Sequence, residues 1–176
     1  MSVSNPAPKK SSLDTIANIA IIVVCAIAAV VLIRNQFFPP RPPGVPEGAK
    51  KGEQFAQIQQ VLPAGTGKAL VVAVQPGCHY CNDSMPFYKR LLDERNQKGS
   101  QVKFIAAVPA DEAKAEELQK FAAVGAKPDD MVKLDFASVK VPGTPTLMLV
   151  DNTGKVLDVW VGKLEADKEK EVLEVL

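Results

Sequence analysis

Two cysteines separated by two residues are the part of this sequence best suited to chemistry. Cys78 and Cys81 enclose His79 and Tyr80. If the pair opens a helix, the unpaired N–H groups and the positive end of the helix dipole favour a thiolate. A thiolate attacks disulfides, and a second cysteine one turn away can release the mixed disulfide. The spacing predicts dithiol–disulfide exchange, with Cys78 attacking and Cys81 as its more buried partner.

Other roles for the cysteine pair fit the sequence less well than exchange. Structural zinc needs about four ligands, whereas His79 is the single histidine and the third cysteine, Cys25, lies in an apolar segment. A soft copper ion held by two sulfurs stays open. A purely structural disulfide this short would stabilise the fold weakly. We therefore expect no resident metal and no cofactor at Cys78 and Cys81.

The two residues between the cysteines have roles that the sequence leaves open. As a cation, His79 would stabilise the Cys78 thiolate. The alternative is an exposed side chain that only touches partners, because exposed charges are easily screened. For Tyr80 we expect a contact surface rather than acid–base chemistry.

The elements predicted around the pair place it where a strand meets a helix. Residues 68–75 form a short continuous apolar run, typical of a strand buried on both faces. Pro76 and Gly77 interrupt the run, and a helix begins near Cys78. This placement makes a Cys-x-x-Cys pair much more specific for redox chemistry than the spacing alone.

The rest of the soluble part predicts an α/β fold. Asp111 is placed to cap a helix and Gly125 to end it. Strand–helix alternation predicts a parallel sheet with helices on both faces, and a terminal hairpin adds antiparallel strands. The further elements are helices over 53–62, 111–124 and 164–176, and strands over 101–108, 131–136, 146–150 and 155–161.

An apolar segment near the N-terminus predicts a membrane anchor over residues 13–38. Residues 19–33 have no polar side chain apart from the Cys25 thiol, and the segment is long enough for a ~30 Å hydrocarbon layer. A cleaved signal peptide is the alternative, but the apolar run continues beyond its Ala-Ile-Ala site. The chain thus divides into a tail (1–12), the anchor (13–38), a proline- and glycine-rich linker (39–52) and a domain (53–176).

The overall charge argues against a nucleic-acid partner. The chain has 21 basic and 20 acidic residues and a net charge of +1, so it lacks the basic excess that attracts phosphate backbones. Positive residues on the two sides of residues 13–38 do not fix the orientation of the anchor.

Three motifs give a family resemblance. The first runs from Cys78 through Cys81 to Met85-Pro86-Phe87. The second is Val-Pro-Gly-Thr-Pro-Thr at 141–146, and the third is the turn at 151–155. With them, residues 53–176 resemble the thioredoxin superfamily: a central mixed sheet flanked by helices. Within it, the chain is similar to membrane-anchored reductases that serve cytochrome c maturation.

The resemblance implies further site residues and a location. The bond between Thr144 and Pro145 would be cis, and Thr144 would pair with a substrate strand beside the cysteines. His79 and Tyr80, by their position between the cysteines, are further candidates for substrate contact. The partners implied are proteins with thiols or disulfides and a redox partner, on the extracytoplasmic, periplasmic side of the membrane.

Two departures from the family pattern leave the direction of exchange open. Gly77 stands where a tryptophan is usual, and Val72 stands where thioredoxin has a buried acid. The alternative function is a copper or haem-assembly chaperone that uses the fold as a binding module. A tethered interaction domain with incidental cysteines is a further alternative.

Overall fold

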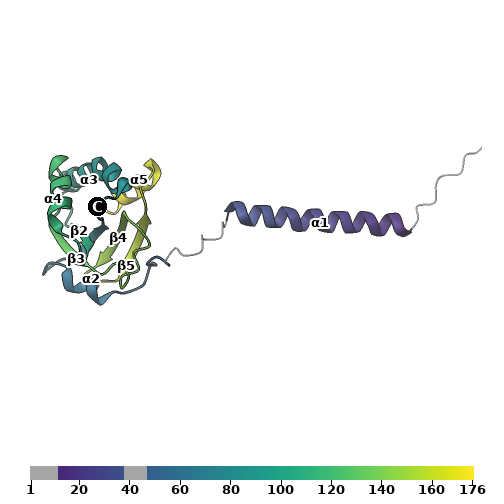
Figure 1. Ribbon diagram of the computed structural model, residues 1–176, viewed down its shortest axis with the longest axis horizontal. Helices are drawn as coiled ribbons and strands as arrows, with labels where there is room; N and C mark the ends of the chain where they lie inside the picture. The colour runs from purple at the N-terminus through teal and green to yellow at the C-terminus, as the bar shows by residue number, and fades with distance from the viewer. Residues whose placement is uncertain (1–11, 38–46) are drawn as a thin grey trace, which may run out of the picture. The chain divides into compact units, whose positions relative to one another are not determined.

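The computed structural model describes residues 12–37 and 47–176, and the chain divides into the units Met1–Val45 and Pro46–Leu176 (Figure 1). Helix α1, Ser12–Phe37, belongs to the first unit. Within the two described ranges, no helix has the combination of length and apolar character that crossing a membrane requires. This finding does not support the membrane-crossing anchor predicted over 13–38. Nearly all of the predicted tail, 1–12, and most of the linker, 39–52, lie outside the described residues.

The second unit is organised around a five-stranded mixed sheet. Its strand order is β3-β2-β1-β4-β5. Strand β2 runs parallel to β1 and β3, whereas β4 runs antiparallel to β1 and β5. The strands are β1 Lys68–Ala73, β2 Lys103–Pro109, β3 Asp130–Leu134, β4 Thr146–Asp151 and β5 Val156–Val161. The predicted mixed sheet with a terminal hairpin is confirmed.

Helices cover both faces of the sheet, as Figure 1 shows. Helices α3, α4 and α5 pack on one face, whereas α2 and loop residues pack on the other. Alternate side chains of β1 enter the two cores, Leu70 and Val72 on the α3 side and Val71 on the α2 side. The helices are α2 Ala56–Val61, α3 His79–Lys98, α4 Lys114–Ala123 and α5 Ala166–Glu174. The prediction that β1 is buried on both faces is therefore confirmed.

Three aromatic rings join α3, α4 and β2. The Tyr88 ring lies 5.8 Å, between centroids, from both Phe104 and Phe121, and the last two lie 6.2 Å apart. Such pairs add ~0.5–1.5 kcal/mol each beyond the area they bury. Burial raises the pKa of the Tyr88 phenol, which therefore stays neutral. The cluster fixes α4 against the helix that begins at the cysteines.

The start of α4 differs from the prediction. We expected Asp111 to cap a helix over 111–124, but α4 begins at Lys114 after Ala113, which makes no side-chain cap hydrogen bond. The Glu112 N–H donates to the Pro109 carbonyl at 3.1 Å, so residues 109–112 form a turn before the helix. The expected end is confirmed, because Gly125 follows with φ of 69°.

The entry segment of the domain pairs with the start of β5. The N–H of Gly52 donates to the carbonyl of Val156, and the N–H of Val156 donates to that of Glu53, both at 2.8 Å. Nearby, the Phe55 N–H donates to Gly154 at 3.0 Å. Gly154 has φ of +75°, and a Cβ there would lie 2.4 Å from the Phe55 carbonyl oxygen. This contact requires glycine in the hairpin turn.

Candidate active site

The backbone delivers Cys78 to the first turn of α3. After β1, Gly77 adopts φ of 73°, a conformation that glycine reaches without strain. The Cys78 N–H donates to the Gln75 carbonyl at 3.3 Å. Cys78 itself is the N-cap residue of α3. The strand-to-helix junction predicted for the cysteine pair is confirmed.

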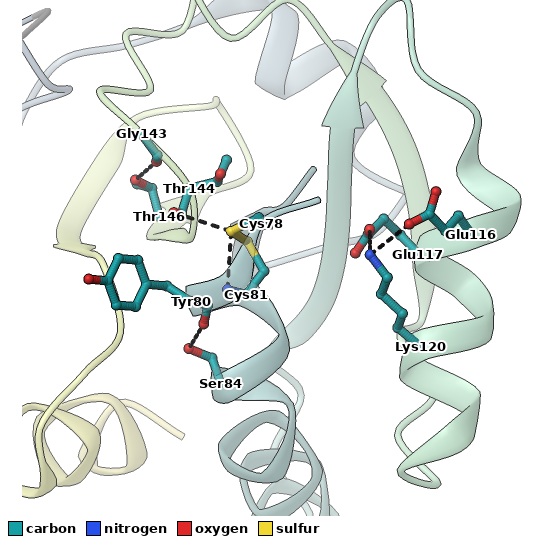
Figure 2. Close-up of a disulfide and its surroundings, with 10 residues drawn as sticks. All are labelled: Cys78, Tyr80, Cys81, Ser84, Glu116, Glu117, Lys120, Gly143, Thr144 and Thr146. Atoms are coloured by element: carbon teal, nitrogen blue, oxygen red, sulfur yellow. Dashed lines mark hydrogen bonds and ion pairs between the residues drawn. A yellow bond between two sulfur atoms is a disulfide. The ribbon is translucent and has the colours of Figure 1, made fainter. Parts of the chain in front are cut away.

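Cys78 and Cys81 form a disulfide across the first turn of α3, with their Cα atoms 5.2 Å apart (Figure 2). Cys81 is fully buried, whereas 9% of Cys78 is exposed. The predicted order of burial, with Cys78 outermost, is therefore confirmed. Of the two cysteines, Cys78 is therefore the one that a partner protein can approach more easily.

Two polar groups act on the Cys78 sulfur in opposite senses. The backbone N–H of Cys81 donates to Cys78 Sγ at 3.1 Å, and an N–H at this place favours a thiolate. The Thr144 carbonyl oxygen lies 3.4 Å from the same sulfur and accepts from a thiol, so it favours the neutral form. Once the disulfide is reduced, the N–H and the positive end of the helix dipole would act together on the side of the thiolate.

The loop that faces the disulfide contains the predicted cis bond, between Thr144 and Pro145. The Thr146 hydroxyl donates to the Gly143 carbonyl at 2.6 Å. The Gly162 N–H donates to the Pro145 carbonyl at 2.7 Å, which ties the loop to the end of β5. Thr144 thus lies beside Cys78, as the family resemblance implied, and the cis bond to Pro145 directly follows it.

His79 and Tyr80 both lie on the surface next to the disulfide. His79 Nε2 lies 3.5 Å from Asp83 Oδ2, one turn along α3. The Tyr80 carbonyl accepts a hydrogen bond from the Ser84 hydroxyl at 2.8 Å. Its ring is exposed and points away from the disulfide in Figure 2. This position suits the contact surface expected of Tyr80.

Comparison with known proteins agrees with this geometry. Residues 54–176 match the thioredoxin-like domain family. The chain belongs to this family. Its cysteine pair closes into a disulfide at the start of a helix, so this thioredoxin-like domain is equipped for dithiol–disulfide exchange, as the spacing predicted.

Two solved structures share the fold. One is described as a thiol:disulfide interchange protein DsbE from Chlorobium tepidum, with 22% identity and a TM-score of 0.52 over 73% of this chain and 95% of that one. The other is described as a protein disulfide isomerase from Bacteroides thetaiotaomicron, with 14% identity and a TM-score of 0.55 over 74% and 91%. No curated protein matches the chain.

Sequence reasoning missed two charged groups near the thioredoxin-like domain's disulfide. Lys163 Nζ lies 3.6 Å from Asp83 Oδ2 and links the β5–α5 connection to the first turns of α3. The two residues are 80 positions apart, so no helical spacing connects them. The usable signal was that Lys163 directly follows the Val161-Gly162 motif.

A buried carboxylate on α4 was also missed. Glu117 is fully buried, and Lys120 Nζ donates to its Oε1 at 2.6 Å. Its Oε2 has no hydrogen-bond partner among the described residues. Lys120 also lies 2.9 Å from Glu116, and Figure 2 shows the three side chains together. The i,i+3 and i,i+4 spacing was visible in the sequence, but the burial was not.

Val72, the strand position where the resemblance would place a buried acid, packs in the apolar core. Within residues 12–37 and 47–176, no group of three or more His, Cys, Asp or Glu side chains is placed to hold a metal ion.

Proposed function

We propose that this chain exchanges disulfides with protein substrates outside the cytoplasm, with Cys78 as the attacking sulfur and Cys81 as the resolving one. The observation that carries the proposal is the asymmetry of the pair. Cys78 is the outer cysteine and has the Cys81 N–H 3.1 Å from its sulfur, whereas Cys81 is fully buried.

In the reducing direction, the Cys78 thiolate attacks one sulfur of a substrate disulfide. A mixed disulfide forms, and the other substrate sulfur leaves as a thiolate, which takes a proton. Cys81 then loses its proton and attacks the Cys78 sulfur. The substrate leaves as a dithiol, and the Cys78–Cys81 disulfide holds the oxidising equivalents until a redox partner reduces it.

The surface around the outer sulfur supports protein rather than small-molecule substrates. The Thr144 carbonyl faces Cys78, so an extended substrate segment that pairs with Thr144 brings its own sulfur close. Pro145, His79 and Tyr80 flank this position. In the proposal these four residues bind the substrate, and the exposed Tyr80 ring offers apolar contact area.

The proposed substrates follow from the sequence resemblance. The Met85-Pro86-Phe87 segment after the cysteines is similar to reductases that serve cytochrome c maturation. The Cys-x-x-Cys-His segments of c-type cytochromes are therefore the first substrates to test. The direction of exchange follows from the potential: ~−270 mV is typical of thioredoxin and ~−120 mV of a strong oxidant.

Attachment to a membrane through residues 13–38, with the domain on the extracytoplasmic side, is a further part of the proposal. It rests on composition, because α1 exposes large apolar side chains along its length, among them Ile16, Ile22 and Ile33. An exposed apolar surface of this kind is covered by lipid or by protein. The test is extraction of the membrane fraction with alkaline carbonate, with a chain starting at residue 47 as the control. If carbonate releases the full chain as completely as this control, the proposed attachment is wrong.

A trapping experiment tests the exchange itself. In the Cys81→Ser variant the resolving sulfur is missing, so a mixed disulfide on Cys78 persists. We expect this variant, expressed in the periplasm, to yield protein adducts that dithiothreitol releases. The Cys78→Ser variant is the matched control and should yield none. Equal amounts of adduct on the two variants, or none on either, would contradict the proposal.

A further inference from the structure

One carboxylate oxygen beside the cysteines faces two basic side chains. Asp83 Oδ2 lies 3.5 Å from His79 Nε2 and 3.6 Å from Lys163 Nζ. The Asp83 side chain is 34% exposed and that of Lys163 is 48% exposed, so water screens the charges in part. The His79 side chain is 80% exposed, so water screens its interaction with Asp83 more strongly than that of Lys163. Asp83 and Lys163 therefore form the main charge pair on this side of the disulfide.

A series of contacts links the Asp83–Lys163 pair to the cysteines. The Cys78 sulfur contacts the Thr144 carbonyl, and the next carbonyl, that of Pro145, accepts from the Gly162 N–H. Lys163 follows Gly162 and reaches Asp83. Asp83 reaches His79, which is the neighbour of Cys78 in the chain. Lys163 is thus held near the cysteines by the same loop that faces the attacking sulfur.

We propose that Asp83 and Lys163 tune the reactivity of Cys78 in opposite directions, with the carboxylate opposing its ionisation and the ammonium group favouring it. This inference rests on the proposed function of Cys78 as the attacking sulfur. Neither residue touches the reacting atoms, so both act through the electrostatic field at Cys78. Exchange chemistry makes this field important because the thiolate is the reactive form.

Other charged side chains also lie in the surroundings of the disulfide that Figure 2 and the ion pairs describe. His79, at the start of α3, is the second basic partner of the Asp83 carboxylate. Glu116, Glu117 and Lys120 of α4 also appear in Figure 2, where the two carboxylates share the Lys120 ammonium group. The variants below leave these three residues unchanged, so their contribution is constant.

The test follows alkylation of the reduced full chain by iodoacetamide against pH, with the Cys78 peptide resolved by mass spectrometry. At pH values below the pKa of the Cys78 thiol, the alkylation rate is proportional to the fraction of Cys78 present as thiolate. For partly exposed charges we expect roughly twofold to fivefold changes. Asp83→Asn should raise the rate, Lys163→Met should lower it, and the double variant should lie close to the wild type. The differences should narrow in ~1 M salt, where the Debye length is ~3 Å.

Two controls test whether the rate changes come from the Asp83 and Lys163 charges. One checks the effect of removing a lysine elsewhere, and the other checks the effect of His79. Lys170→Met removes an exposed lysine of α5 that pairs with Glu174 instead, and it should leave the rate unchanged. Repeating the Asp83→Asn comparison in a His79→Gln background removes the shared partner, and the increase should persist. If Asp83→Asn and Lys163→Met both raised the alkylation rate of Cys78, both lowered it, or both left it unchanged, the inference would be overturned. Trapping on Cys81→Ser would still succeed in that case, so the two proposals fail separately.

Discussion

Replacing Lys120 by methionine should destabilise the domain by about 2–3 kcal/mol at neutral pH. The Glu117 carboxylate is fully buried, and one of its oxygens has Lys120 as its partner at 2.6 Å. The other oxygen has no partner among the residues that the structure describes. Without Lys120 the carboxylate is buried and uncompensated, a change that costs ~3–5 kcal/mol in closed interiors. The Lys120 side chain is 23% exposed, so water moderates the loss.

Two further variants show whether burial of the carboxylate is the cause. Glu116 lies 2.9 Å from the same ammonium group but is 56% exposed, so Glu116→Gln should cost ~1 kcal/mol or less. The double variant Lys120→Met, Glu117→Met removes both charges and fills the space with apolar atoms. It should recover most of the stability lost in Lys120→Met.

The assay is urea unfolding of each full chain, followed by the fluorescence of the single tryptophan, Trp160. Burial opposes the charge on Lys120, but hydrogen bonds to Glu117 and Glu116 outweigh it and raise the pKa above 10.5. The stabilisation is therefore complete at pH 7 and declines only as the pH rises through that raised pKa. A loss under 1 kcal/mol in Lys120→Met, or a double variant no more stable than it, would refute this reasoning.

Two predictions concern the hairpin between β4 and β5. Gly154→Ala should lower the melting temperature much more than Gly52→Ala, because a Cβ at 154 meets the Phe55 carbonyl at 2.4 Å whereas nothing lies within 4 Å of one at 52. Both glycines have positive φ, so the backbone strain is matched; similar losses would contradict the contact argument. Asp151→Ala should destabilise the domain at pH 7, because the hydrogen bond from the Thr153 hydroxyl lowers the Asp151 pKa below 3.8. That stabilisation is present above the usual pKa and is lost as the pH falls through the lowered one, so urea midpoints of variant and wild type should converge in acid.

The features that local pattern determines could be predicted from the sequence. A continuous apolar run marked β1, and the Pro-Gly break after it placed Cys78 at a helix start. The turn at 152–154 between two apolar segments marked the hairpin. In each case the signal lies within about ten residues, where periodicity and turn chemistry act directly.

Contacts between distant segments could not be predicted in the same way. The ion pair of Asp83 with Lys163 and the adjacent hydrogen bond from Gly162 to the Pro145 carbonyl both join distant segments, and no sequence spacing reveals either. The burial of Glu117 depends on where α4 packs against the sheet. The predicted start of α4 was wrong. Asp111 is a good cap residue by type, but the chain forms a turn from Pro109 to Glu112 before the helix begins.

The most direct test of the account is a redox titration of the Cys78–Cys81 pair. A Cys25→Ser variant is equilibrated in glutathione buffers of graded potential, and its free thiols are alkylated and counted by mass spectrometry. Because the two sulfurs act as one unit, both thiols should disappear together in a single two-electron transition, which spans ~30 mV per tenfold change in the equilibrium ratio. Independent modification of Cys78 and Cys81, with no disulfide between them at any potential, would contradict the account.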